Sequence, residues 1–270
     1  MEFTVDRGEC RLSGESRGRG PVLLMIHGVG CDGTYFSAAA DFLAGRSTVV
    51  TYDRRGYSKS PSCKGASYAI GAQAEDASQI LRFLHAGPSF VVGCSAGGVI
   101  ALELARRHPE QVGGLLLHEP PLGTSGSFRK ELADWLSRLH GFAERGKIAA
   151  AALEFVRALG GVDPRAPKRP LQEQRQNLMN LEVFLYREMD RLAEYLHVLP
   201  EHISLSAPCA VAVGERDADG LFSKYGGDAA RRLNCPLLHA AGYHNMAADL
   251  PLDFASLVLG AFSILLEKQK

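Results

Sequence analysis

The 270-residue chain has no excess of charge of either sign, because 30 Lys and Arg residues balance 30 Asp and Glu residues. A balanced chain has no net field that would draw it to nucleic acid or to an anionic lipid surface. The basic pair Arg54 and Arg55, like the other basic pairs, stands alone and is typical of a solvated face. Nucleic-acid and membrane partners are therefore not expected.

Targeting signals and long apolar runs are also missing. The first six residues lack the basic and then apolar layout of a secretory signal. The longest apolar run, residues 254–266, is too short to span a bilayer, and Asp253 and Glu267 flank it. A buried C-terminal helix and a cytoplasmic location are the expectations that follow.

The cysteines lack any metal-binding pattern. The six of them, at positions 10, 31, 63, 94, 209 and 235, show neither a CxxC spacing nor a cluster with histidine. Buried thiols in a reducing compartment are the simplest explanation. The sequence therefore predicts no structural metal site.

Short apolar runs alternate with helical segments along most of the chain. Runs of the kind found in strands covered on both faces occupy residues 21–26, 47–52, 90–92, 113–117, 209–213 and, more weakly, 235–239. Helical segments such as 70–85 and 252–266 fall between or after them. This alternation predicts an α/β fold with a doubly wound, mostly parallel sheet and right-handed crossovers.

One interval, residues 122–206, breaks this rhythm. It contains no convincing strand, and its apolar residues recur at helical spacing. We therefore predict a helical cap over 122–206, inserted into a core made of 1–121 and 207–270. Its aromatic and methionine side chains, Trp135 among them, suggest an apolar pocket for a medium-sized substrate.

The segment 93–97, Gly-Cys-Ser-Ala-Gly, has the pattern of a strand-to-helix elbow that presents a nucleophile, Ser95. The turn strains the backbone of that serine, and flanking glycines avoid a clash. The helix that begins near Ala96 directs free N–H groups and a positive dipole end at the site. Cys94 adjoins the pocket in sequence and is expected to be a packing residue.

An activated serine needs a base, and the base needs an orienting acid. These partners should follow later strands in the chain order serine, acid, histidine. Asp217 and His244 each follow their own strand in that order, so we predict a triad of Ser95, Asp217 and His244. Asp219 and Glu119 compete for the acid role, and Glu119 has the alternative of a pocket-wall residue beside two prolines.

The oxyanion hole needs two N–H donors. One is expected from Ala96, which follows the nucleophile. The other is expected from the loop after the strand 21–26, with Val29 as the best candidate and Gly28 beside it. Tyr243, which precedes the predicted base, is expected to shape the pocket.

The chain resembles the α/β-hydrolase family of the capped type in five short motifs, at 27–30, 53–60, 93–97, 214–217 and 242–244. The resemblance covers nearly the whole chain outside 122–206. It implies an eight-stranded, mostly parallel sheet and a serine hydrolase mechanism without a cofactor. Ser58 stands where many relatives have a second glycine, and Tyr243 stands where Gly-His is commoner. Neither departure touches the predicted triad.

The expected reaction is hydrolysis of a carboxylic ester or lactone through an acyl-enzyme, with a small molecule as the partner and a homodimer left open. Hydrolysis of a C–C bond by the same triad is the chemical alternative. Serine at the elbow argues against epoxide opening and halide removal, for which relatives use aspartate.

Two alternatives come from other classes of protein. A ligand-binding protein could keep all three triad residues and turn over little. Residues 28–33 also form a literal G-x-G-x-x-G after a strand, with Asp53 about 20 residues further on, as in a nicotinamide-dependent oxidoreductase. That interpretation leaves the elbow and His244 unexplained.

Overall fold

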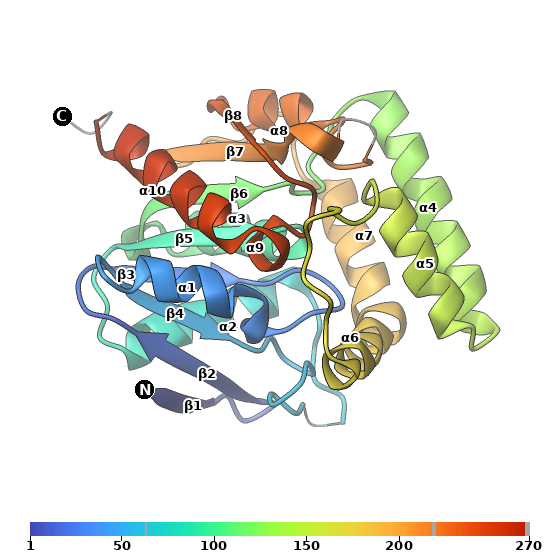
Figure 1. Cartoon of the computed structure of the whole chain (residues 1–270), viewed down its shortest axis with the longest axis horizontal. Coiled ribbons are helices and arrows are strands. Elements are labelled where there is room, and N and C mark those ends of the chain that lie inside the picture. Colours follow the sequence, from blue (N-terminus) through green and yellow to red (C-terminus); the bar gives the residue numbers. More distant parts are fainter. Residues whose placement is uncertain (63, 218–219, 268–270) are drawn as a thin grey trace.

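The computed structural model describes residues 1–62, 64–217 and 220–267, which fold into an eight-stranded sheet with helices on both faces (Figure 1). The spatial order of the strands is β1-β2-β4-β3-β5-β6-β7-β8. The strands are β1 (Glu2–Asp6), β2 (Arg11–Arg17), β3 (Val22–Ile26), β4 (Thr48–Tyr52), β5 (Ser89–Cys94), β6 (Val112–His118), β7 (Cys209–Gly214) and β8 (Leu237–Ala240).

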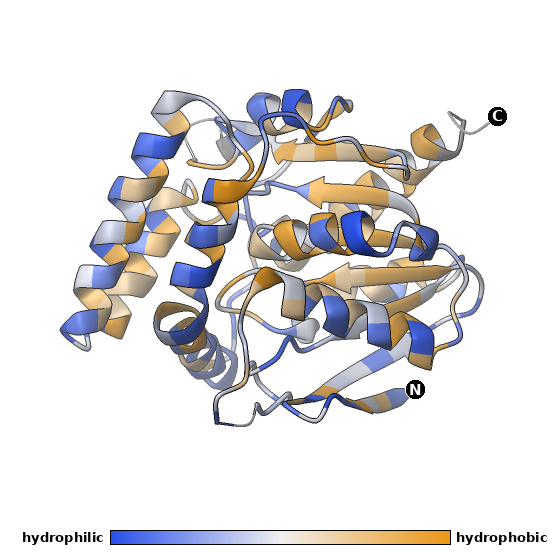
Figure 2. Ribbon diagram, turned by 180° about the vertical axis from the view of Figure 1, so that it is seen from behind, coloured by the Kyte–Doolittle hydropathy of each residue, from blue (hydrophilic) through white to orange (hydrophobic). Residues whose placement is uncertain are grey.

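Only β2 runs against the other strands. Strand β1 is antiparallel to β2 and β2 is antiparallel to β4, whereas the pairs from β4 through β8 are all parallel. The central strands are nearly continuous hydrophobic runs because helices cover them on both sides (Figure 2). The predicted doubly wound, mostly parallel sheet is confirmed.

Two hydrophobic clusters fill the space between the sheet and its helices. One face packs against α1 (Ser37–Leu43), α9 (Met246–Asp249) and α10 (Pro251–Glu267). The other packs against α2 (Ile70–Phe83), α3 (Ala96–Arg107) and α8 (Gly226–Arg232). Three short 3₁₀ turns complete the core: η1 (Gly33–Phe36), η2 (Pro109–Gln111) and η4 (Glu215–Asp217).

Four helices and a turn of π-helix lie between β6 and β7. They are α4 (Gly126–Glu144), α5 (Ile148–Ala158), α6 (Leu171–Val183), the π-helical turn η3 (Phe184–Glu188) and α7 (Met189–Val198). Figure 1 places them together beside the end of the sheet where β6 and its parallel neighbours finish. We call this group the cap; its limits at 122 and 206 stay a prediction.

The C-terminal apolar run forms α10, which the second cluster buries against the sheet. In the described ranges, no helix is both long and apolar enough to cross a membrane. Three of the cysteines, Cys10, Cys94 and Cys209, are buried, and Cys31 and Cys235 are half-buried. Cys63 lies outside the described residues.

Candidate active site

Ser95 occupies a sharp turn between β5 and α3, as the sequence predicts for an elbow. Its backbone has φ 54° and ψ −124°, a strained conformation for a residue with a side chain, and its N–H donates to the carbonyl of His118 (2.9 Å). Gly97 permits the turn, because a Cβ there would lie 2.2 Å from the carbonyl oxygen of Ile26. The elbow therefore holds Ser95 where α3 begins.

A buried carboxylate holds the imidazole of His244. The Nδ1 atom of His244 lies 2.6 Å from Oε2 of Glu119, and both side chains are buried. The other carboxylate oxygen, Oε1, accepts the N–H of Gly214 (2.7 Å) and the hydroxyl of Ser223 (2.5 Å). The acid partner of His244 is therefore Glu119.

This geometry favours Glu119, which the sequence offered as a competitor, over Asp217 as the acid that orients the base. Asp217 ends the turn η4 after β7, and its side chain, like the whole of Asp219, lies outside the described residues. The single Nδ1 of His244 is already engaged by Glu119. We therefore assign the orienting role to Glu119 in the mechanism proposed below, and the assignment of Asp217 stays a prediction.

The sheet explains why Glu119 reaches the site. Cys94 on β5 pairs with His118 on β6, so Ser95 and Glu119 are the residues that follow a matched pair on neighbouring strands. Glu119 turns sharply there, with φ 46°, and its N–H donates to the carbonyl of Ala212 on β7 (2.9 Å). The register of β5 against β6 is the signal that favours Glu119 over Asp217 and Asp219 as the acid.

The charge of Glu119 is stabilised despite its burial. Burial raises the pKa of this carboxyl group, but the hydrogen bond and charge of His244, with further help from the Ser223 hydroxyl, outweigh it and lower the pKa to about 2. Glu119 is thus ionised at neutral pH. An ionised carboxylate can stabilise a positively charged His244.

The loop after β3 lies directly against the nucleophile. A Cβ built on Gly28 would be 3.1 Å from the Cβ of Ser95, so the backbone of this loop approaches the serine closely. Val29, next along the loop, is half-buried and lines a cavity. Ala96 is the first residue of α3, so its N–H has no partner within the helix.

His27 fixes the conformation of that loop. Its Nε2 accepts the backbone N–H of Arg54 (3.0 Å), so Nδ1 carries the proton and donates to the carbonyl of Gly28 (2.8 Å). Burial and the charge of Arg54 lower the pKa of His27 to about 3, which keeps the ring neutral.

The prediction that Arg54 and Arg55 form a solvated face is wrong, because both are buried.

A cavity of about 380 Å³ lies between the cap and the core. Val29 and Asn245, which follows His244, belong to its core wall, and Phe155 and Leu181 belong to its cap wall. An ion pair between Arg169 and Asp249 (2.8 Å) borders it. The cavity is therefore largely apolar, is lined by the predicted oxyanion loop and by the residue that follows His244, and is bordered by one charged pair.

Trp135, Cys94 and Tyr243 are not among the residues that line this cavity. Trp135 packs edge-on against Phe155 of the cap and Phe222 of the core, and the ring of Phe222 in turn lies 5.7 Å from that of His244. Cys94 belongs to the core beneath the sheet, and burial raises its pKa well above the ordinary thiol value. Tyr243 is half-buried in the turn before His244. Trp135 and Cys94 therefore act in packing.

Asp53, the ribose-binding acid of the oxidoreductase interpretation, is already engaged by the backbone. Both carboxylate oxygens of Asp53 accept backbone N–H groups, from Gly33 (2.8 Å) and Lys59 (2.9 Å). Asp53 therefore ties together two loops at the ends of β3 and β4. In the described part of the chain, no group of three side chains is arranged to hold a metal ion.

The lowered pKa of Glu119 predicts a specific loss of stability in acid. A carboxyl group whose pKa is lower in the folded than in the unfolded state stabilises the fold above its unfolded pKa, and this contribution disappears as pH falls toward the folded pKa. We expect the difference in unfolding free energy between wild type and Glu119→Gln to shrink between about pH 5 and pH 2. Urea titrations across this range measure it, and a constant difference contradicts the assignment.

Comparisons with known proteins agree with this architecture. Residues 21–160, just over half of the chain, match the family model described as the alpha/beta hydrolase fold. An uncharacterised hydrolase of Bacillus subtilis, YraK, is 40% identical over 126 residues, which is 44% of this chain and 46% of that protein. The magnesium-chelatase 30 kDa subunit of Rhodobacter capsulatus is 38% identical over 90 residues, covering 33% and 32%. The chain thus spans less than half the length of these curated relatives.

Solved structures share the fold over nearly the whole chain. A thermophilic esterase from Thermogutta terrifontis matches with a TM-score of 0.73 and 20% identity, over 98% of this chain and 99% of that one. An alpha/beta hydrolase from Sphaerobacter thermophilus matches with a TM-score of 0.74 and 22% identity, over 96% and 100%. From the family match and the eight-stranded sheet together, the chain belongs to the α/β-hydrolase family.

Proposed function

We propose that this protein is a serine hydrolase that cleaves a carboxylic ester or a lactone of a medium-sized, largely apolar small molecule. The observation that carries the proposal is the buried hydrogen bond between His244 and Glu119 beside the strained elbow of Ser95. A base held by a buried carboxylate next to a strained serine is the arrangement that nucleophilic catalysis requires.

In the proposed reaction, Ser95 Oγ attacks the carbonyl carbon while Nε2 of His244 takes the hydroxyl proton. The Nδ1–H of His244 stays on Glu119, whose negative charge stabilises the imidazolium. The N–H groups of Ala96 and Val29 receive the oxyanion of the tetrahedral intermediate. His244 then gives its proton to the leaving alcohol, and the acyl group remains on Ser95.

Water completes the cycle. His244 removes a proton from a water molecule as its oxygen attacks the acyl carbon, and the proton returns to Ser95 when the acid leaves. His244 is bound to Glu119 through Nδ1, which leaves Nε2 for these transfers. The apolar cavity beside Val29 is the proposed site of the substrate's hydrocarbon part.

A screen of p-nitrophenyl esters of increasing acyl length, together with simple lactones, tests this proposal. We expect an initial burst of p-nitrophenol close to the enzyme concentration, followed by slower steady turnover, because so activated an ester acylates the serine faster than the acyl-enzyme is hydrolysed. Stopped-flow absorbance measures the burst. If no ester or lactone is hydrolysed and none gives a burst, a ligand-binding role replaces the proposal.

A further inference from the structure

A buried ion pair joins the cap to the loop beside the nucleophile. Arg54 follows β4 in the core and is 1% exposed, whereas Glu188 ends the turn η3 in the cap and is 0% exposed. The guanidinium of Arg54 donates from Nη1 to Oε1 and from Nη2 to Oε2 (3.3 Å) of Glu188. The two residues are 134 positions apart in sequence.

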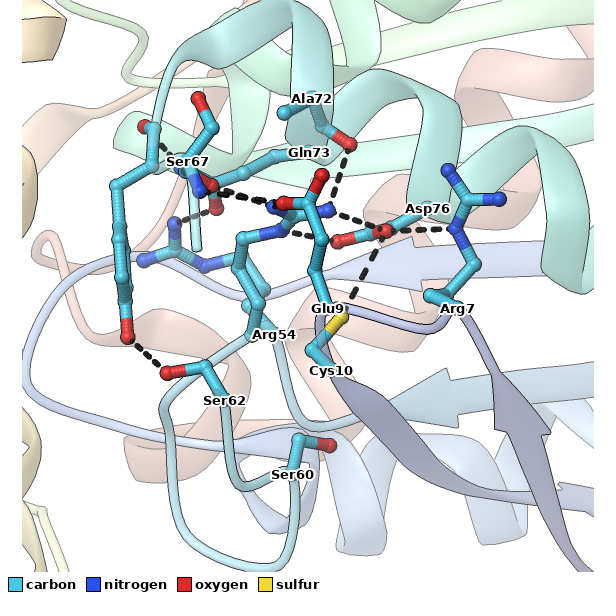
Figure 3. Close-up of polar contacts among 12 residues, drawn as sticks. Arg7, Glu9, Cys10, Arg54, Ser60, Ser62, Ser67, Ala72, Gln73 and Asp76 are labelled. Carbon is cyan, nitrogen blue, oxygen red and sulfur yellow. Dashed lines mark hydrogen bonds and ion pairs between the residues drawn. The ribbon is translucent and has the colours of Figure 1, made fainter. Parts of the chain in front are cut away.

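Each member of this pair has further partners that fix its position. Glu188 also accepts the Tyr57 hydroxyl and the side-chain amide of Gln73 (2.9 Å). Gln73 in turn accepts a hydrogen bond from Nη1 of Arg54 (2.7 Å), and Figure 3 shows these two side chains meeting above the loop that follows β4. The carboxylate of the cap is thus held by three side chains of the core.

Arg54 extends this network to the predicted oxyanion loop. Its Nη2 donates to the carbonyl oxygen of Gly28 (2.9 Å), which also accepts the Nδ1–H of His27. The carbonyl of Gly28 and the N–H of Val29 belong to one planar, trans peptide group and point in opposite directions. Two donors on the carbonyl therefore fix the direction of the Val29 N–H.

Stability alone does not account for the pair. Removing two charges from water is costly, and apolar side chains of similar volume often support a fold equally well. The cap also departs from regular helix at this point, because the N–H of Met189 bonds to the carbonyl of Phe184, five residues earlier. Such π-helical turns are rare and occur often at functional sites. Here the turn ends on Glu188.

We propose that Glu188 is a positioning residue for the oxyanion hole. It holds Arg54, Arg54 holds the Gly28 carbonyl, and the Val29 N–H is thereby aimed at the substrate oxygen. This inference rests on the proposed function and deepens it, because it makes full catalytic activity depend on the cap being seated on the core. Displacing the helix that carries Glu188 releases the donor without any change at Ser95.

The double variant Arg54→Met/Glu188→Leu tests the proposal, because it removes both charges and leaves no buried ion without a partner. We expect a kcat about 100-fold lower for a p-nitrophenyl ester, the size of effect seen when one oxyanion donor is lost, with KM within about threefold of wild type. The matched control is Arg55→Met/Asp76→Leu, which removes the neighbouring buried pair (2.6 Å). That pair does not touch Gly28, so we expect a near wild-type kcat.

A double variant that unfolds at the wild-type temperature and keeps the wild-type kcat overturns the inference. An equal loss of kcat in the control Arg55→Met/Asp76→Leu overturns it as well. If the double variant does not fold, Glu188→Gln takes its place, with an expected fall in kcat of about tenfold. Unchanged kcat in Glu188→Gln likewise overturns it. Labelling of wild-type Ser95 by a fluorophosphonate separates a failure of the proposed function from a failure of this inference alone. Without labelling, the proposed function fails and this inference with it.

Discussion

Replacing Ser95 by alanine is expected to lower kcat for ester hydrolysis by about 10⁶-fold and to abolish labelling by a fluorophosphonate probe. The probe forms a covalent bond with an activated serine oxygen, and alanine offers no such atom. Intact-mass spectrometry of the labelled protein measures the effect directly, as one adduct per chain in wild type and none in the variant.

The control for this experiment is Ser89→Ala. Ser89 begins the same strand, is buried, and donates its hydroxyl to the carbonyl of Gly87 (2.9 Å), far along β5 from the elbow. Labelling and hydrolysis should persist in this variant. An adduct of undiminished yield in Ser95→Ala would mean that another side chain is the nucleophile, and the mechanism would have to be rebuilt around that residue.

The second large effect is expected from Glu119→Gln, which should lower kcat by about 10⁴-fold with little change in the fold at neutral pH. The amide is nearly the same size as the carboxylate, but it carries no charge to stabilise the imidazolium. Its NH₂ group can also donate to Nδ1 and so favour the tautomer with the proton on Nε2, which cannot accept the proton of Ser95.

Asp217→Asn provides the matched comparison, because it makes the same chemical change at the acid that follows the next strand. We expect its kcat to stay within about threefold of wild type, since His244 Nδ1 is held by Glu119. Steady-state kinetics of the two variants on one ester decide between the acids. A large loss in Asp217→Asn with near-normal Glu119→Gln would restore the acid that the sequence first suggested.

The sheet and the elbow were predictable from the sequence because their signals are local. Continuous apolar runs mark strands that are covered on both faces, and the small residues around Ser95 mark a tight turn. The acid was harder to predict, since Glu119, Asp217 and Asp219 all follow strands. The choice depended on strand register and on one left-handed residue, Glu119, which no local pattern reveals.

The ion pair that links the cap to the core lay beyond prediction for a different reason. Arg54 and Glu188 are both charged and far apart in the chain, and each by itself is typical of the surface. Only the fold brings them together and buries them. Trp135 was assigned to the pocket because the aromatic content of the cap indicates an apolar interior. Composition does not show which of these side chains face a pocket and which pack against one another.

The left-handed backbone of Ser95 and Glu119 sets a limit on how stable this fold can become. Each such residue costs about 1–3 kcal/mol, and the two stand side by side at the ends of β5 and β6. Glycine would relieve both conformations, so a search for heat resistance alone would favour replacing the very residues to which the proposed mechanism assigns the chemistry. Under the proposed mechanism, thermal robustness and catalytic power therefore compete at these two positions, and a stabilised variant that stays active must gain its added stability elsewhere.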